Sequence, residues 1–307
     1  MRKTGKGLHS IYFDCDNTMG LPGCDMDDGM ALLYLLGRDD VRLQAVTTSF
    51  GNSTIHRVHA NTKRMFQELG LDDHLPLKKG APSKAHRRSQ ASHFLATDIP
   101  RQSHPVKLLI TGSTTNIYAA CLENADMLNW VDEMIFMGGV TEPLFIGGKP
   151  MRELNFSSDP EATRYLLNCP VKKTIASAQL CLDAFFDHQK MQIVLKQQEI
   201  PAFAYLKAPL KRWYDFISVQ YGMPGFYAWD IVAAVYITHP KLFERHEVCI
   251  KSTVEDLQSG FLRVEDKTTA NGDIAANVVN LPTHIRDRDL FWRVVCDTWK
   301  NVPMNKQ

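Results

Sequence analysis

The stretch IYFDCDNTMGLPGCDMDDGMALLYLLG, residues 11–37, decides the fold. It opens with a short apolar run typical of a buried strand, passes through an acidic turn, and continues as an apolar helix pattern that stops at Gly37. The turn contains five aspartates, which are Asp14, Asp16, Asp25, Asp27 and Asp28. One or two acids would be explained as helix caps, because negative charge is favourable at a helix N-terminus, but five are too many. Carboxylates this close raise one another's pKa, and a divalent cation relieves that repulsion, so the turn predicts a metal site.

The rest of the chain alternates short strand-like runs with helical patterns. The runs are rich in β-branched or aromatic residues and include VRLQAVTTSF (41–50), VKLLITG (106–112), EMIFMGG (133–139) and KKTIAS (172–177). This alternation predicts an α/β fold with an open, mostly parallel, Rossmann-like central sheet flanked by helices. EVCIKSTVED (247–256) and GFLRVED (260–266) predict a small antiparallel pair near the C-terminus. Because no repeat or linker composition divides the chain, we expect a single domain over residues 1–307.

Polar residues follow several of these runs at the point where each run ends. Asp14 and Asp16 end the first run, Asn52 follows the second, and Thr111 and Met137 come at the ends of later ones. In open α/β sheets, ligands bind outside the carboxyl ends of the strands. The recurrence therefore predicts one catalytic face.

The composition excludes several classes of partner. The 307 residues carry a net charge of +1, which provides no field for nucleic acid or for a membrane surface. No apolar run is long enough to span a membrane, and the N-terminal MRKTGKGLHSIYF lacks an apolar signal core. We therefore expect a cytoplasmic protein that acts on a small molecule. The seven cysteines are scattered without C-x-x-C pairs, so free thiols are expected rather than disulfides or a zinc site.

The acidic turn has a second interpretation as the active site of a magnesium-dependent phosphatase. DCDNT (14–18) has Asp-x-Asp-x-Thr spacing, in which Asp14 would be the nucleophile and Asp16 the general acid. That chemistry also requires a lysine and an acidic pair after later strands. Lys172 and Lys173 precede a predicted strand instead, and NGDIAAN (271–277) offers one acid. The phosphatase alternative stays open, but its set of residues is incomplete.

Several motifs, in order along nearly the whole chain, resemble those of the inosine-uridine-preferring nucleoside hydrolase family. The family's D-x-D-P-G-x-D-D corresponds to DCD (14–16) and MDDGMALL (26–33), here separated by an inserted segment. The remaining motifs are AVTTSFGNST (45–54), LLITGSTTNI (108–117), IFMGG (135–139), ELNFSSDPEA (153–162) and WDIVAAVY (229–236). The resemblance implies a calcium-dependent enzyme that converts a nucleoside and water to free base and ribose. It also implies homodimers or homotetramers.

The resemblance implies a role for individual positions of this chain. The Ca²⁺ ligands would be Asp16, Asp28, Asp230 and the backbone carbonyl of Thr115. Asp16 would also be the catalytic base, and Asp14 would orient its neighbours. The substrate contacts would include Asp27, Asn52 and Asn155 at the ribose 2′- and 3′-hydroxyls, Glu153 on the 5′ side, and Met137. Carboxylates around the sugar would favour an oxocarbenium-like transition state.

The chain departs from the family at places that bear on the substrate. Trp229 stands where many members have a histidine that protonates the leaving base, and it resembles the purine-specific branch, in which a tryptophan stacks on the purine. Its alternative role is packing in the core. Gly147 replaces an asparagine, which leaves open a 5′-substituted substrate or a non-catalytic nucleoside-binding relative. His93 and Phe94 align with a mobile loop over the base and are expected to contact it.

Overall fold

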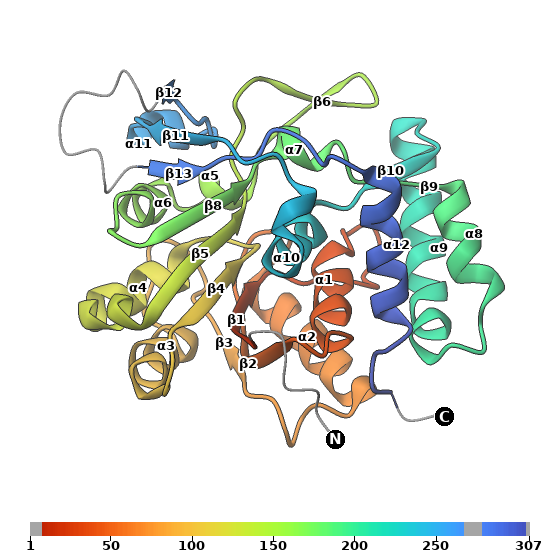
Figure 1. Cartoon of the computed structure of the whole chain (residues 1–307), viewed down its shortest axis with the longest axis horizontal. Coiled ribbons are helices and arrows are strands. Elements are labelled where there is room, and N and C mark those ends of the chain that lie inside the picture. Colours follow the sequence, from red (N-terminus) through yellow and green to blue (C-terminus); the bar gives the residue numbers. More distant parts are fainter. Residues whose placement is uncertain (1–7, 267–277, 305–307) are drawn as a thin grey trace.

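The computed structural model describes residues 8–266 and 278–304, and most of its strands join one sheet (Figure 1). In spatial order the strands of this nine-stranded sheet are β12 (Val264–Asp266), β11 (Glu247–Ile250), β13 (Val278–Asn280), β8 (Lys172–Ala176), β5 (Val131–Met137), β4 (Val106–Ile110), β1 (His9–Cys15), β2 (Val41–Thr48) and β3 (Leu77–Lys79). Strands from the first and last parts of the chain belong to this one sheet, which supports our proposal of a single domain.

The sheet is parallel from β3 through to β13, and β11 alone runs in the opposite direction, antiparallel to both of its neighbours β13 and β12. The predicted fold class is therefore confirmed. The expected antiparallel pair near the C-terminus is also confirmed, since Val248 of β11 pairs with Asp266 of β12. Two small antiparallel pairs lie outside the main sheet: β6 (Leu144–Ile146) with β7 (Lys149–Met151), and β9 (Phe185–Asp187) with β10 (Gly225–Tyr227).

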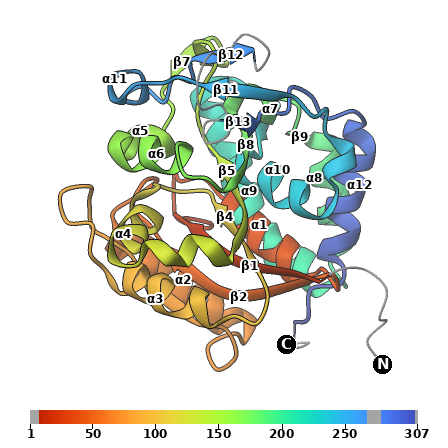
Figure 2. The same ribbon diagram turned by 60° about the vertical axis from the view of Figure 1, so that its left-hand side comes forward.

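Helices cover both faces of the sheet, as Figures 1 and 2 show. One face is covered by α3 (Gln90–Asp98), α4 (Thr115–Glu123) and α6 (Pro160–Leu167), and the other by α1 (Asp27–Leu36), α2 (Ile55–Leu69) and α10 (Trp229–Thr238). Helix α12 (Arg288–Trp299) packs on α1, and the remaining helices of at least two turns are α8 (His188–Lys196) and α9 (Pro201–Tyr221). Because side chains alternate along a strand, Ile11 and Phe13 of β1 pack into one core and Tyr12 into the other. The apolar β1 is thus buried on both sides, and the acidic turn begins where it leaves the core.

The inserted segment between β1 and α1, residues 17–25, is held against two helices. Asn61 of α2 donates from Nδ2 to the carbonyls of Asn17 (3.3 Å) and Met19 (3.2 Å). Gly23 has φ +66°, a conformation that side-chain-bearing residues rarely adopt, and lies against Phe216 of α9. The segment therefore folds back on itself and returns the chain to the end of β1, where α1 begins.

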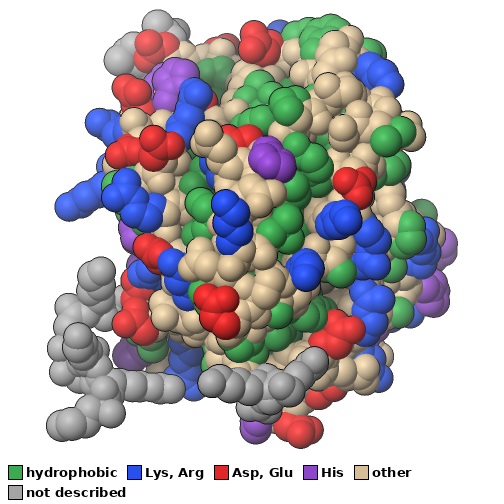
Figure 3. Space-filling view, turned by 90° about the vertical axis from the view of Figure 1, so that its right-hand side faces the viewer, with side chains coloured by type: hydrophobic (Ala, Val, Ile, Leu, Met, Phe, Trp, Pro, Cys, Tyr) green, Lys and Arg blue, Asp and Glu red, His purple; other side chains and the backbone are tan. Residues whose placement is uncertain are grey.

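The outer surface carries both signs of charge. Figure 3 shows basic and acidic side chains interspersed with apolar ones on the right-hand face of the view in Figure 1. Among the described residues, we find no helix of the length and apolarity that crossing a bilayer requires.

Candidate active site

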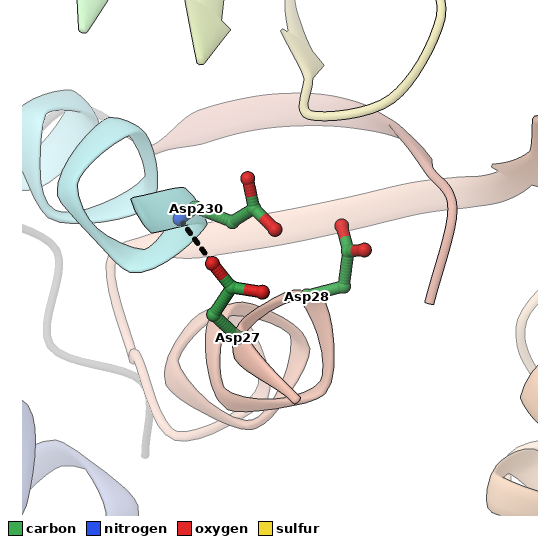
Figure 4. Close-up of side chains that lie close together, drawn as sticks. All are labelled: Asp27, Asp28 and Asp230. Atoms are coloured by element: carbon green, nitrogen blue, oxygen red, sulfur yellow. Dashed lines mark hydrogen bonds between the residues drawn. The ribbon is translucent and has the colours of Figure 1, made fainter. Parts of the chain in front are cut away.

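Three aspartates from two helix N-termini meet beyond the carboxyl ends of the central strands. Helix α1 begins with Asp27 and Asp28, and Asp230 lies in the first turn of α10. Their carboxylate oxygens lie within 4.8 Å of one another, and all three side chains are buried (Figure 4). The backbone N–H of Asp230 donates to Oδ2 of Asp27 at 3.1 Å, which fixes the two helices relative to each other. We call Asp27, Asp28 and Asp230 the acidic cluster.

Asp16 lies beside the acidic cluster and is oriented by the loop that follows β2. Its Oδ2 accepts the backbone N–H of Asn52 at 2.5 Å, and its Oδ1 accepts Nδ2 of Asn52 at 3.2 Å. The Asp16 carboxylate also contacts that of Asp28. Glycine at position 51 permits this close approach, because a Cβ added there would lie 2.0 Å from Oδ2 of Asp16. The sequence motifs at the ends of the first two strands therefore meet at one point.

The electrostatics of these carboxylates fit a hard divalent cation. Burial raises the pKa of Asp16 to about 6. Burial, followed by the charges of Asp16 and Asp27, raises the pKa of Asp28. Burial and the neighbouring carboxylates raise that of Asp230 in the same way. Oδ2 of Asp28 is buried and has no hydrogen-bond partner among residues 8–266 and 278–304. Since a buried anionic oxygen without a partner is costly, this donor set fits Ca²⁺, which binds carboxylate oxygens.

Asp14 is buried behind the acidic cluster, in the position expected of a supporting carboxylate. Its Oδ2 accepts Oγ1 of Thr47 (2.5 Å) and Nδ2 of Asn116 (2.8 Å), and its side chain is 2% exposed. Burial raises its pKa to about 7. A phosphatase nucleophile must instead face the substrate. Lys172 is the first residue of β8, so it lies at the amino end of that strand, whereas the cluster lies beyond the carboxyl ends of the strands. NGDIAAN (271–277) lies outside the described residues.

A pocket beside the acidic cluster collects most of the predicted substrate contacts. Asn155 is anchored at its floor, because its Nδ2 donates to the carbonyls of Thr111 (2.9 Å) and Met137 (3.0 Å). Trp229 is 9% exposed, and its ring centroid lies 5.4 Å from that of Tyr227. The lining residues are Asp25, Asp27, Asn52, Thr111, Met137, Leu144, Met151, Arg152, Glu153, Leu154, Asn155, Ala178, Trp229 and Asp230.

A comparison of the sequence with known protein families identifies the family of this chain. The model for the inosine-uridine preferring nucleoside hydrolases matches residues 11–293. The chain belongs to this family. It is therefore an enzyme of the nucleoside N-ribohydrolase class. The prediction of the family from the sequence motifs is confirmed.

The nucleoside hydrolase resembles known members along most of its length. It is 24% identical over 302 residues to the pyrimidine-specific ribonucleoside hydrolase RihA of Shewanella woodyi, covering 86% of this chain and 90% of the relative. A plant nucleoside hydrolase has the same fold, with a TM-score of 0.82 at 16% identity and coverage of 95% of this chain and 99% of the other. The purine-preferring ribonucleoside hydrolase of Gardnerella vaginalis follows with a TM-score of 0.79 at 17% identity, covering 95% and 98%.

In this nucleoside hydrolase, Glu153 has its carboxylate occupied by backbone donors. Oε1 accepts the N–H groups of Gly139 (3.1 Å) and Phe156 (2.8 Å), and Oε2 accepts that of Ser157 (2.9 Å). The oxygens predicted to contact the 5′ side of the ribose therefore already accept structural hydrogen bonds. The carboxylate ties the pocket wall to the loop after β5 and caps the short helix α5 (Asn155–Ser158).

Replacing Glu153 by Gln is expected to lower the free energy of unfolding by about 1–3 kcal/mol, because an amide N–H₂ would face a buried backbone N–H. Denaturant titration measures the change. Glu142→Gln, at an exposed carboxylate, is the matched control and is expected to stay within about 0.5 kcal/mol of the parent. Equal stability of the two variants would argue against this role of Glu153.

The predicted Ca²⁺ ligand at Thr115 is its backbone carbonyl, which the side-chain contacts of this motif do not test, so that role stays a prediction. Thr115 lies in the first turn of α4, and its Oγ1 donates to Oδ2 of Asp159 at 2.9 Å. The threonine of this motif that reaches the acidic cluster is Thr111, whose Oγ1 donates to Oδ1 of Asp28 at 2.6 Å. The reason is positional: Thr111 follows β4 directly, at the strand end, whereas Thr115 has already entered the next helix.

The structure contradicts the predictions that His93 and Phe94 contact the base. Ser89 forms a capping box with Ser92, so these residues begin helix α3 rather than a loop over the base. His93 is exposed and pairs with Glu123 at the end of α4 (2.5 Å). Phe94 packs against Tyr12, with ring centroids 6.4 Å apart, on the sheet face covered by α3 and α4. Both side chains are used in packing α3 onto the fold.

Several residues that line the pocket were not assigned a role from the sequence. Asp25, from the inserted segment, hydrogen-bonds to Asp27, and burial raises its pKa. Met151 and Arg152 come from β7 and the residue after it, and Leu144 comes from β6. Gly147 and Gly148, with φ +55° and +74°, form the turn between β6 and β7. Such a glycine pair is typical of a hairpin, so the sequence could have predicted this part of the pocket lining.

Proposed function

We propose that this enzyme hydrolyses the N-glycosidic bond of purine ribonucleosides with the help of Ca²⁺ at the acidic cluster. The observation that carries the proposal is the convergence of Asp27, Asp28 and Asp230 beside a pocket that is also lined by Trp229. The predicted Ca²⁺ dependence and purine preference are both parts of this proposal.

The residues that would hold Ca²⁺ are Asp16, Asp28 and Asp230, with Asp27 beside them. Bound there, the cation supplies positive charge that acidifies a water and attracts ribose hydroxyl oxygens. The chain contributes the geometry, since Asn52 holds Asp16 and Thr111 holds Asp28. The buried carboxylates therefore do not need to rearrange when the substrate arrives.

Asp16 would act as the general base. Its two hydrogen bonds from Asn52 orient the carboxylate beside the acidic cluster, where the attacking water would lie. Asp27 and Oδ1 of Asn155 would accept the ribose hydroxyls. As the bond to the base breaks, positive charge develops on the sugar, and these anionic and polar oxygens stabilise it more than they stabilise the neutral substrate.

Trp229 would hold the leaving base by stacking. Its indole lines the pocket and is supported from behind by Tyr227. A purine presents a larger face than a pyrimidine, so stacking favours purines. Leu144 and Ala178 add apolar surface to the same pocket.

Replacing Trp229 by Ala is expected to lower kcat/KM for inosine by about 10-fold or more, since an aromatic contact and its buried area are lost. Uridine should lose less, because it overlaps less with the ring. Trp229→Phe is the matched control and should retain most of the inosine activity. An equal loss on inosine and uridine would contradict base stacking. The relatives named pyrimidine-specific make this comparison of bases the direct test of preference.

The experiment that tests the whole proposal is ribose release from purine and pyrimidine nucleosides, with and without a chelator. Chelator-sensitive ribose release that is faster from purines supports it. Binding of nucleoside without any turnover would instead identify a non-catalytic relative, and phosphate release from generic phosphomonoesters would identify a phosphatase.

Location and assembly remain predictions. The seven cysteines are free thiols in the structure, which is compatible with the cytoplasmic location that we propose. The proposed homodimer or homotetramer is measurable by sedimentation.

A further inference from the structure

We propose that Arg152 binds a 5′-phosphate, so that the preferred substrate class is ribonucleoside 5′-monophosphates rather than plain nucleosides. This inference rests on the proposed N-ribohydrolase function. It starts from a contrast of charge within the pocket, whose lining has a single guanidinium among the acidic residues Asp25, Asp27, Glu153 and Asp230.

Arg152 is the one cationic side chain among the described residues that line the pocket. It is exposed at the mouth, and it forms no hydrogen bond or ion pair with any residue in the described ranges. The neighbouring cation of the same hairpin behaves differently. Lys149 donates from Nζ to the carbonyl of Gln220 at 2.6 Å and lies 5.3 Å from the ring centroid of Tyr221. Lys149 therefore anchors the hairpin to α9, and the guanidinium of Arg152 is left available to a ligand.

The backbone that carries Arg152 is rigidly attached to the catalytic centre. The next residue, Glu153, accepts three backbone N–H groups, and Asn155 donates to the carbonyls at the ends of β4 and β5. These bonds connect the Arg152 segment to the ends of β4 and β5, next to Thr111, which donates to Asp28 of the acidic cluster. The arginine can thus bind a ligand group without an ordering cost for its backbone.

The chemistry of a ribonucleoside orients it in this pocket. The cis-diol oxygens are the hard, hydroxyl ligands that suit the acidic cluster and its cation. The base and the 5′-carbon are the other large substituents of the ribose, so they leave the cluster towards the remaining walls. Trp229 suits the base, and the wall formed by Met151, Arg152 and Leu154 is then left for the 5′ side.

A guanidinium on that wall recognises an anionic substituent. Its planar fork matches two oxygens of a phosphate monoester, and this charge-assisted pair is stronger than a neutral hydrogen bond. A 5′-phosphate would otherwise enter a pocket whose charged lining consists of carboxylates, and Arg152 offsets that repulsion. A plain 5′-hydroxyl needs no such cation.

Kinetics on paired substrates test the inference. For the parent enzyme with Ca²⁺, kcat/KM for inosine 5′-monophosphate is expected to exceed that for inosine by about 10-fold or more. The products are hypoxanthine and ribose 5-phosphate. Arg152→Gln should lower kcat/KM for the monophosphate at least about 10-fold more than for inosine. Arg42→Gln is the matched control, because Arg42 is an exposed arginine at the amino end of β2. A higher efficiency on inosine, or an equal loss on both substrates, would overturn the inference.

Binding separates this inference from the proposed function. In calorimetry with Ca²⁺, ribose 5-phosphate is expected to bind about 10-fold tighter than ribose to the parent and the Arg42→Gln variant, and this difference should vanish in Arg152→Gln. Equal affinities in the parent overturn the phosphate site, even where inosine is hydrolysed. Tight binding of ribose 5-phosphate without cleavage of any N-glycosidic bond supports the phosphate site and contradicts the proposed function. Inorganic phosphate as a third probe shows whether the ribose is needed.

Discussion

Asp16→Asn is expected to lower kcat for ribose release by about 10²–10⁴-fold, the range typical of a lost general base. Asn has nearly the same shape as Asp, and its carbonyl can still accept the backbone N–H of Asn52. What it cannot do is take a proton from water. KM should change less than kcat, because the proton moves only as the reaction proceeds. Steady-state kinetics on inosine measure both constants.

A matched control for this substitution is Asp39→Asn, at an exposed aspartate in the turn before β2. It is expected to keep parental kinetics. Circular dichroism of both variants should show the parental content of helix and strand. Turnover by Asp16→Asn within about 3-fold of the parent would remove Asp16 from the role of base.

Removing the metal is expected to have the second large effect. Chelation should lower turnover by at least about 100-fold, and added Ca²⁺ should restore it. The same addition should raise the melting temperature by about 5 °C, because an ion that binds only the folded state stabilises it by mass action. Calorimetry or fluorescence-based melting provides this second measurement, which does not depend on catalysis.

The Ca²⁺-dependent rise in melting temperature should be larger at pH 8 than at pH 5.5. Burial raises the pKa of Asp16 to about 6 and raises those of Asp28 and Asp230. A carboxyl whose pKa is raised in the folded state stabilises the metal-free protein below its unfolded pKa, and this stability is lost as the pH rises through the folded value. The metal-free protein is therefore weakest at high pH, where Ca²⁺ also meets no competition from protons. Asp230→Asn should abolish most of the rise, and a melting temperature that ignores Ca²⁺ at both pH values would contradict the metal site.

Much of the fold could be predicted because its signals are local. The apolar run at residues 11–15 is buried on both faces, which the continuous hydrophobicity indicated, and Gly37 ends α1 as its position in the pattern predicted. The strand β13 could not be anticipated in the same way. It has only three residues, and its place between β8 and β11 depends on distant pairing rather than on its own composition.

The site was predictable where a motif lies at a strand end or a helix start. Asp28, Asn52 and Asp230 are such residues, and the structure brings them together. Prediction was wrong at His93 and Phe94, which a capping box places in helix α3 rather than in a loop over the base. Thr111 and Thr115 stand in one quoted motif, and only the exact point at which β4 ends decides which of them reaches the acidic cluster. Arg152 had no local signal, because its place in the pocket comes from the hairpin packing on α9.

The contact between Asp27 and Asp230 joins positions 203 residues apart. The proposed Ca²⁺, held by both helices, would act as a reversible cross-link between the first and last thirds of the chain. During synthesis, the N-terminal acids must wait for α10, so the site is completed late and ion binding cannot nucleate the fold. The proposed cross-link would make catalysis depend on a long-range contact, because the acidic cluster is assembled only when α1 and α10 pack together.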